Sequence, residues 1–347
     1  MADITLRGAG IFGLSIAGAC SLRGAGVQVI DPFGPAAGAS GGLVGALAPH
    51  VPETWNEKKA FQFESLIRAD RFWSEVETAG GTGAGYGRTG RLQPIADAPA
   101  LALAHARAQN AVTLWKGLAS WTVIPQQDAG DWAPHSPTGY LIHDTLSARI
   151  HPRHACLALV AALRTRGIEV MAEAEDQGAV IWATGVHGLE QLNAGHTRMV
   201  GNGVKGQAAL LRPIRALPKG APQLFADALH IIPHADGTVA IGSTSERDYA
   251  DPTGTDAQLD EIIARARIQS PALDGAEVIE RWAGLRPRAR SRAPMLGPWP
   301  GNPGHFIANG GFKIGFGMAP KVADVMADLV LEDQDRIPDA FRVEASL

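Results

Sequence analysis

A glycine turn lies close to the N-terminus, between a short apolar run and a stretch with helical spacing. The turn is Gly8-Ala9-Gly10-Ile11-Phe12-Gly13, and it follows the run Ile4 to Leu6. In a strand–turn–helix unit, the first glycine permits the tight turn, the second lets the backbone approach a diphosphate, and the third lets helix and strand touch. The turn therefore predicts a nucleotide-binding βαβ unit whose helix begins near Ile11.

The second strand predicted for this unit ends in an acidic residue. The apolar run Val27 to Ile30 is followed directly by Asp31 and Pro32. A carboxylate at this position can accept hydrogen bonds from the hydroxyl groups of a ribose, and it repels a 2′-phosphate. We therefore expect FAD or NAD as the ligand rather than NADP.

The composition excludes collagen-like and disordered chains. Glycine accounts for 41 of 347 residues, without the three-residue period of collagen, and 46% hydrophobic residues exclude a disordered chain. The length predicts two domains. A net charge of −4 argues against nucleic acid as a partner, and the two cysteines, each in an apolar run, suggest neither disulfides nor a metal cluster.

The beginning of the sequence lacks a basic segment followed by an apolar one, and no apolar run is long enough to span a membrane. We therefore expect a cytoplasmic protein with no transmembrane segment. His151 and His154 have a spacing seen in metal ligands, but a proline separates them and no third ligand is near, so no metal site is expected.

The rest of the chain alternates between helical and strand patterns. Helices are predicted over 57–79, 98–118, 151–166, 256–267 and 318–331, and strands over 168–171, 180–183, 230–233, 238–241, 278–282 and 305–308. Only short strands are expected between 121 and 150. A loop is expected over 80–90, where six of eleven residues are glycine.

Two further motifs consist of small residues near the predicted nucleotide unit. Gly38-Ala39-Ser40-Gly41-Gly42, followed by Leu47-Ala48-Pro49-His50, offers free amides that can wrap the ribityl and diphosphate part of a flavin, which NAD lacks. A flexible linker is the alternative. Ala183-Thr184-Gly185 ends a buried strand and can form a wall of the same nucleotide site.

The last two motifs are Trp282-Ala283-Gly284-Leu285-Arg286-Pro287 and Asn309-Gly310-Gly311-Phe312-Lys313-Ile314-Gly315. The order of all these motifs, together with Gly206-Gln207 and Gly242-Ser243-Thr244, resembles the D-amino-acid oxidase family of FAD-dependent amine oxidases over nearly the full length, and within it the glycine oxidase branch. The resemblance implies an α/β fold: a Rossmann-like FAD-binding domain of the glutathione-reductase type, and an antiparallel-sheet substrate domain.

The resemblance also implies domain boundaries and residue roles. The FAD-binding domain would comprise 1–45, 146–200 and 300–347, and the substrate domain 46–145 and 201–299. Arg286 would pair with the substrate carboxylate, and Lys313 would lie beside the flavin. His50 is expected to reach the active-site cavity because it follows the predicted flavin loop. The residues expected to bind the cofactor are Gly8, Gly10, Ile11, Phe12, Gly13, Asp31, Pro32, Ala39, Ser40, Leu47, Ala48, Ala183, Thr184, Gly185, Gly311, Phe312, Lys313, Ile314 and Gly315.

The implied reaction is transfer of a hydride from the α-carbon of an amine or amino acid to N5 of non-covalently bound FAD, giving an imine that hydrolyses. Oxygen or a quinone would be the electron acceptor, so an amino-acid dehydrogenase is one alternative. A flavin-dependent enzyme that modifies wobble uridine in tRNA is another. Family members usually insert a three-stranded meander before the Ala183 motif, where this chain has only residues 172–179, so the adenine pocket must be built differently.

Five arginines occur between 281 and 292, at Arg281, Arg286, Arg288, Arg290 and Arg292. Three interpretations are open: solvated strand faces, a site for a substrate with two acidic groups, or contact with an RNA backbone. Relatives usually carry an acidic residue after the GLRP motif and an arginine at the position of Lys313. The identity of the substrate is therefore left open.

Overall fold

The computed structural model describes all residues from 1 to 347. The chain opens with strand β1 (Ile4–Arg7), helix α1 (Ile11–Leu22) and strand β2 (Val27–Ile30). Gly8 lies between β1 and α1 with φ of 106°, a backbone conformation that favours glycine. The predicted βαβ unit is therefore present, and its helix begins at Ile11 as expected.

A six-stranded sheet is built around this unit. Its other strands are β8 (Val170–Met171), β9 (Ala179–Trp182), β15 (Met295–Pro298) and β16 (His305–Asn309), and its order is β15-β16-β9-β1-β2-β8. Ile4 pairs in parallel with Val27 and with Ala179, so β1, β2 and β9 have their carboxyl ends at one edge. Crevices at such an edge are the usual ligand sites of parallel sheets.

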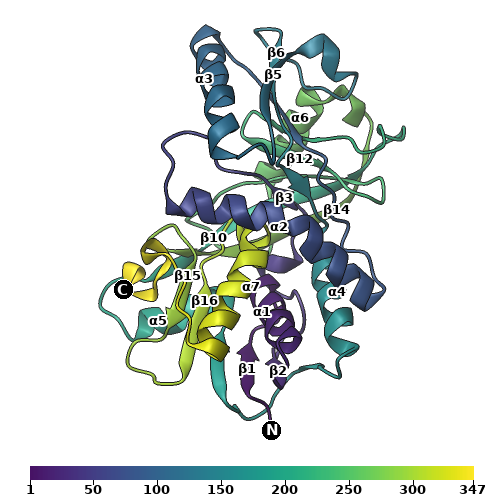
Figure 1. Cartoon of the computed structure of the whole chain (residues 1–347). Coiled ribbons are helices and arrows are strands. Elements are labelled where there is room, and N and C mark those ends of the chain that lie inside the picture. Colours follow the sequence, from purple (N-terminus) through teal and green to yellow (C-terminus); the bar gives the residue numbers. More distant parts are fainter.

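Helices cover this sheet. Helices α1, α2 (Glu57–Gly80), α4 (Pro152–Arg164) and α7 (Gly315–Glu332) share one apolar core. Helix α5 (Gly185–Ala194) packs in a separate, smaller cluster with β15 and β16. Figure 1 shows α1, in purple, beside α7, in yellow, with α2 lying across them. The buried side chains Leu14, Leu66 and Met326 belong to one core cluster, so the first and last helices of the chain are packed together.

The second sheet has eight strands and forms the other half of the molecule, at the top of Figure 1. Its order is β14 (Glu277–Ala289), β10 (Gly201–Arg212), β13 (Val239–Gly242), β12 (Leu229–Pro233), β11 (Gln223–Ala226), β4 (Arg91–Pro94), β6 (Tyr140–Asp144) and β5 (Trp121–Pro125). All pairings are antiparallel except that of β4 with β11. Helix α3 (Ala98–Leu114) packs against β5.

The two faces of this sheet are used differently. One face packs on helix α6 (Ala257–Gln269), through Leu211, Ile241 and Ile263. The opposite face carries Ala208 and Ile232, which contact Leu43 from the small-residue segment that follows β2. The second face therefore looks toward the nucleotide unit, and strands β3 (Ala46–Leu47) and β7 (Ala148–Arg149) form a short two-stranded sheet of their own.

Several predicted boundaries were wrong. The strand predicted to end at Trp282 continues through the GLRP motif to Ala289, because β14 lies at the edge of its sheet, where Pro287 costs no ladder hydrogen bond. Helix α3 stops at Leu114, since Lys116 and Gly117 have positive φ. Helix α7 begins at Gly315 rather than at residue 318, and strand β15 was missed.

The domain boundaries stay a prediction, although the sheets bear on them. Strand β15 belongs to the six-stranded sheet, whereas the boundary at 300 would assign it to the substrate domain. Helix α2 shares the apolar core of the six-stranded sheet. No helix combines the length and the apolar character needed to cross a membrane.

Candidate active site

The glycine turn lies at the carboxyl end of β1, where segments distant in sequence meet. A Cβ on Gly8 would lie 2.4 Å from the carbonyl oxygen of Ala183, and one on Gly13 would lie 1.9 Å from the carbonyl oxygen of Gly8. Neither distance leaves room for a side chain. A Cβ on Gly10 would meet only Ser40, at 3.1 Å. The N-terminus of α1 is therefore free of side chains where a diphosphate could approach.

Asp31 closes the turn from the end of β2. Its carboxylate accepts hydrogen bonds from the amide of Ala9, at 2.7 Å, and from the amide of Phe33, at 3.0 Å. Because a carboxylate has about four acceptor positions, two of them stay free for a ribose. Pro32, beside it, is exposed.

The small-residue segment after β2 is hydrogen-bonded along its length and is not a flexible linker. Ala39–Gly41 form a single helical turn, in which the Ser40 hydroxyl accepts a hydrogen bond from the amide of Ile11 at 3.0 Å. Gly41 accepts one from the Arg153 guanidinium at 2.7 Å. Leu47 is buried in β3, and the Ala48 carbonyl accepts a hydrogen bond from Gln62 of α2. The segment is thus attached to α1, α4 and α2.

Ala183-Thr184-Gly185 joins β9 to helix α5, directly beside the glycine turn. The Thr184 hydroxyl is buried and has no hydrogen-bond partner in the protein. Asn309, which sequence reasoning missed as a site residue, donates from its side-chain amide to the Gly185 carbonyl at 2.8 Å. A buried hydroxyl without a partner is a donor and acceptor that a bound ligand can satisfy.

The terminal glycine turn brings a second helix N-terminus to the same place. A Cβ on Gly311 would lie 3.1 Å from the ring of Phe12, and one on Gly315 would lie 3.6 Å from Ile11. Ile314 is the N-cap of α7, so the N-termini of α1 and α7 are adjacent. Two positive helix ends, a bare glycine turn and the free Thr184 hydroxyl fit a long anionic dinucleotide such as FAD.

Arg286 lies on β14, and its guanidinium reaches across Gly206 of the neighbouring strand. It donates to the Ser243 hydroxyl at 2.8 Å, the Thr244 carbonyl at 2.7 Å and the Lys205 carbonyl at 3.1 Å. Its Nε is buried without a partner. Burial lowers the pKa of Arg286 to about 10, against the opposing effect of Glu246, so the group is charged at neutral pH.

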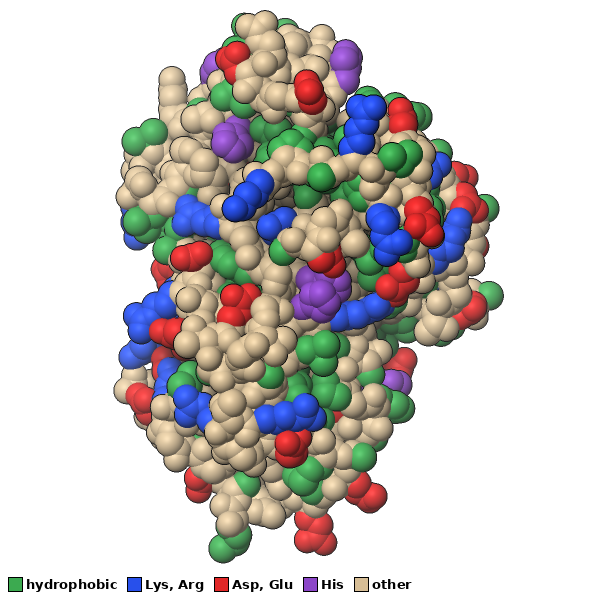
Figure 2. All heavy atoms as spheres, turned by 90° about the vertical axis from the view of Figure 1, so that its right-hand side faces the viewer, with side chains coloured by type: hydrophobic (Ala, Val, Ile, Leu, Met, Phe, Trp, Pro, Cys, Tyr) green, Lys and Arg blue, Asp and Glu red, His purple; other side chains and the backbone are tan.

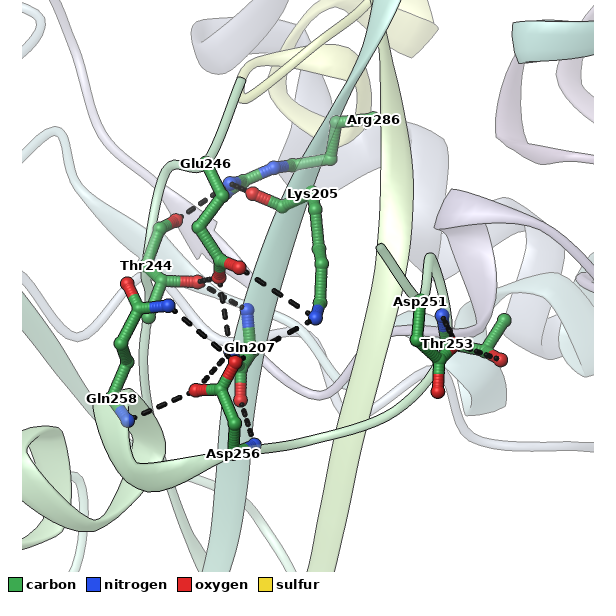
Figure 3. A network of polar contacts seen from close by, with 9 residues as sticks. All are labelled: Lys205, Gln207, Thr244, Glu246, Asp251, Thr253, Asp256, Gln258 and Arg286. Carbon is green, nitrogen blue, oxygen red and sulfur yellow. Dashed lines mark hydrogen bonds and ion pairs between the residues drawn. The ribbon is translucent and has the colours of Figure 1, made fainter. Parts of the chain in front are cut away.

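Behind this arginine lies a polar network, drawn in Figure 3. The Glu246 carboxylate is 3.6 Å from the Lys205 ammonium and accepts a hydrogen bond from Gln207 at 3.0 Å. Gln207 also donates to Asp256, at 2.9 Å. Lys205 and Gln207 are buried. The network fixes the segment from Ser243 to Glu246, which supplies two of the acceptors for Arg286.

The terminal turn meets β14 at Phe312. Its amide donates to the Pro287 carbonyl at 3.0 Å, and its ring lies under three cations: Arg286 at 5.5 Å and Arg288 and Lys313 at 5.7 Å from the ring centre. Lys313 has an exposed side chain. Its pKa is below the usual value because protein partly surrounds the ammonium group and because of the Arg286 charge. The structure thus brings Arg286 and Lys313 together.

His50 is held by helix α2. Its ring Nδ1 makes a short contact with the Gln62 side-chain oxygen, which also accepts from the His50 amide at 2.7 Å. Burial, opposed by the Gln62 hydrogen bond, lowers the pKa of His50, and Lys58 and Lys59 lower it further. No hydrogen bond or ring contact joins His50 to Arg286 or Lys313, so its place in the substrate cavity stays a prediction.

His230 was missed as a candidate. It pairs with Gly242 across β12 and β13 and therefore shares a sheet face with Ile232, the face that looks toward the nucleotide unit. Its Nδ1 is buried without a partner. Burial, with smaller effects from Arg91 and Lys313, lowers its pKa to about 3, so the ring is neutral. A lone histidine in an apolar strand gives no sequence signal.

The five arginines between 281 and 292 have different surroundings in the structure. Arg281 pairs with Asp260 of α6, and Arg290 donates to the backbone of Ser346. Arg288 and Arg292 have no ion-pair partner. In Figure 2, which shows one face of the molecule, basic side chains gather around a hollow in the upper half.

The two histidines considered as metal ligands have structural partners. His151 is the N-cap of α4, and its ring stacks on that of His154 with 3.8 Å between the ring centres. Burial is the largest of several effects that lower the pKa of His151 to about 4. No cluster of metal-binding side chains is present.

Comparison with known proteins adds to this geometry. A family model described as FAD dependent oxidoreductase (DAO) matches residues 3–329. Glycine oxidase of Pseudomonas putida is 35% identical over 133 residues, 37% of this chain and 34% of the relative. The bifunctional protein ThiO/ThiG of Trichormus variabilis is 26% identical over 371 residues, 96% of this chain and 53% of the relative. The chain thus spans a third to a half of these curated relatives.

Solved structures share the fold along the whole chain. Glycine oxidase from Geobacillus kaustophilus superposes with a TM-score of 0.84 at 20% identity, covering 99% of this chain and 98% of that one. Iminodiacetate oxidase from Chelativorans sp. gives 0.85 at 20% identity and covers 98% of both. The predicted α/β fold, with a Rossmann-like domain and an antiparallel sheet, is confirmed.

Proposed function

The chain belongs to the DAO family of FAD-dependent oxidoreductases, and on that premise we propose that it oxidises the carbon–nitrogen bond of an amino acid or small amine that carries a carboxylate. The names of its relatives support this substrate class, since glycine oxidases occur among both the curated proteins and the solved structures. FAD, when bound, accepts at N5 the hydride that leaves the substrate α-carbon.

The chain's own residues have separate parts in holding the cofactor. The turn at Gly8, Gly10 and Gly13 and the N-terminus of α1 would receive the diphosphate, and Asp31 the ribose. The Thr184 hydroxyl, which has no partner within the protein, would form a hydrogen bond with the ligand. The N-terminus of α7, at Gly315, would stabilise negative charge on the flavin ring. Both cysteines, Cys20 and Cys156, are buried in helices and lie outside these motifs, so binding would be non-covalent.

The main support for a substrate with a carboxylate is Arg286. Its guanidinium is positively charged, forms no ion pair, and keeps a buried Nε without a partner beside Phe312. Two of its five N–H donors, on Nε and on Nη1, are not used within the protein, and each can donate a charge-assisted hydrogen bond to a carboxylate. Arg286 would thereby orient the α-carbon of the substrate, and orientation supplies most of the catalysis in such a reaction. The substrate amine loses the hydride from its α-carbon and a proton from its nitrogen to become an imine, which water hydrolyses to a carbonyl compound and an amine or ammonia.

The acceptor of the electrons is proposed to be oxygen, because glycine oxidases occur among both the curated relatives and the similar solved structures. An L-proline dehydrogenase of the same fold keeps a quinone as the second candidate. A dehydrogenase that reduces a quinone is distinguished from an oxidase by its products. An oxidase forms hydrogen peroxide in proportion to the substrate that it consumes, whereas a dehydrogenase consumes amine in air without forming peroxide.

The test is a panel of amines mixed anaerobically with FAD-loaded protein while flavin absorbance is followed. Glycine, N-methylglycine, D-alanine, L-alanine and L-proline are compared with ethylamine, which has no carboxylate. We expect bleaching by at least one carboxylated compound and none by ethylamine. Arg286→Met should raise the KM for the carboxylated substrate at least about a hundredfold, and the control Arg281→Met should leave it unchanged.

Two results would contradict the proposal. One is bleaching by ethylamine as fast as by its carboxylated counterparts. The other is an unchanged KM in Arg286→Met, which would move the carboxylate site elsewhere. Peroxide measured after admission of air then identifies the acceptor.

A further inference from the structure

Three cations surround the Phe312 ring, but the proposed reaction uses only one of them for the substrate carboxylate. Arg286 and Arg288 are two residues apart on β14 and therefore lie on the same face of the strand. Lys313 approaches the ring from the terminal turn. Arg288 and Lys313 have neither an ion-pair partner nor a side-chain hydrogen bond. Two charges are therefore available beside Arg286.

The surroundings do not neutralise these charges. Arg292 and Arg247 lie close enough to Arg288 to lower its pKa, after the larger effect of partial burial. Glu246 is the carboxylate near Arg286, and it is already bound to Lys205. Elsewhere on β14 the charged side chains are paired: Arg281 with Asp260, and Glu280 with Arg153. An unbalanced cationic site is unusual because like charges destabilise one another unless an anion joins them.

We propose that Arg288 and Lys313 bind a second acidic group of the substrate, so that the preferred substrates are amines or amino acids with two carboxylates. This inference rests on the proposed function, in which Arg286 holds the first carboxylate. The second carboxylate would lie beside Phe312, between the Arg288 guanidinium and the Lys313 ammonium. A substrate bound through both carboxylates rotates less freely than one bound through a single carboxylate. Its α-carbon, from which the hydride leaves, is therefore oriented more precisely.

The structure also limits the alternative interpretations of the arginine cluster. A solvated strand face fits Arg281, which is exposed and paired, but not Arg286, which is mostly enclosed. Contact with an RNA backbone requires a continuous basic stripe, whereas Arg290 is directed to the C-terminal segment. Arg286, Arg288 and Lys313 share the Phe312 ring and form no ion pair. Arg292 is also without an ion-pair partner, but it does not contact that ring.

Binding of unreactive acids tests the inference without turnover. FAD-loaded protein is titrated with propionate and with succinate, which have one and two carboxylates, and the Kd is measured by calorimetry. Succinate should bind at least about tenfold more tightly than propionate at low salt, because a charge-assisted hydrogen bond is worth roughly 1.4 kcal/mol or more. The ratio should fall as salt is raised, since exposed charges are screened.

Substitutions at the two cations test whether they cause the preference for succinate. Arg288→Gln and Lys313→Gln, made separately, should each reduce the succinate-to-propionate preference several-fold, and the double variant should abolish it. Arg281→Gln removes a charge from the same strand, outside the site, and should keep the full preference. Equal binding of the two acids by the native protein would overturn the inference, as would a preference that survives in the double variant.

These binding measurements can fail or succeed independently of the proposed reaction. If no amine reduces the flavin but succinate still binds more tightly than propionate, the proposed reaction is contradicted and the second anion site is supported. Reduction by glycine together with equal binding of both acids would support the reaction and contradict the second site. With an anaerobic panel extended to N-(carboxymethyl)glycine and aspartate, kcat/KM should favour the dicarboxylic compounds over glycine by about tenfold or more.

Discussion

Glu246 holds in place the segment that binds Arg286, although it forms no hydrogen bond with Arg286 itself. Glu246 is buried with Lys205, the two side chains being 9% and 4% exposed, and it accepts hydrogen bonds from Gln207 and Thr244. It follows Ser243 and Thr244, which accept from the Arg286 guanidinium. A buried ion pair contributes little net stability, but loss of one partner leaves an uncompensated charge. We therefore assign Glu246 to positioning.

This assignment predicts a specific pattern of stability. Glu246→Gln should lower the free energy of unfolding by about 3 kcal/mol, since Lys205 then keeps only the half-exposed Asp256 at 4.0 Å. Lys205→Met should cost a similar amount. The double variant should lose at least about 1 kcal/mol less than the sum of the two, measured by urea denaturation. Strictly additive losses would show that the two side chains do not interact as described.

The Glu246–Lys205 pair should also affect the binding of a carboxylate by Arg286. In Glu246→Gln, the Kd of propionate should rise, because the segment that accepts two Arg286 hydrogen bonds is less firmly fixed. The control is Glu75 of α2, an exposed carboxylate that pairs only with Arg71 on the same helix. Glu75→Gln should neither change the free energy of unfolding by a comparable amount nor change the Kd of propionate.

Among the secondary-structure elements, helix α1 depends most on bare backbone. It contains two glycines in different surroundings. A Cβ on Gly13 would lie 1.9 Å from the backbone of Gly8, whereas a Cβ on Gly18 would have no neighbouring atom within 4 Å. One glycine is therefore required by packing and the other is not.

A matched pair of substitutions tests this difference. Gly13→Ala should destabilise the protein by about 2 kcal/mol, because α1 must move away from β1, and should weaken FAD binding by displacing the amides at Ile11 and Phe12. Gly18→Ala, in the same helix, should stabilise it by about 0.5–1 kcal/mol, since alanine has the higher helix propensity. Thermal unfolding and FAD titration measure both effects. Equal stability of the two variants would contradict the packing described for the turn.

Local patterns predicted the elements that depend on local chemistry. The βαβ unit, α2 and the hairpin of β12 and β13 follow from apolar periodicity and from turn residues such as Asp236-Gly237. The extent of β14 could not be predicted in this way, because glycine and proline disfavour a strand by propensity. Pairing with β10 along its whole length, at a sheet edge, overrides that preference.

On the scale of the whole molecule, the candidate site depends on contacts between distant segments. Gly8 meets Ala183, Phe312 meets Pro287, and Arg286 meets Ser243. The family resemblance predicted the residues on the motifs, Arg286 and Lys313 among them. It could not predict His230 or Glu246, since their neighbours are determined by strand register and by the fold of the 243–256 segment.

The arrangement supports a proposal for how the chain is divided. We propose a nucleotide domain built on the six-stranded sheet and a substrate domain built on the eight-stranded sheet, with β15 and α2 assigned to the former. The Arg286 side of β14 and the N-terminus of α7 meet at Phe312. The substrate would therefore be oxidised between the two domains.

Titration of the purified protein with FAD tests whether the chain is a flavoprotein. We expect that one FAD binds per chain, that its visible absorbance spectrum shifts on binding, and that denaturation releases it intact because no covalent bond forms. A colourless protein that gives no spectral shift and no calorimetric signal with added FAD would contradict both the cofactor site and the proposed reaction.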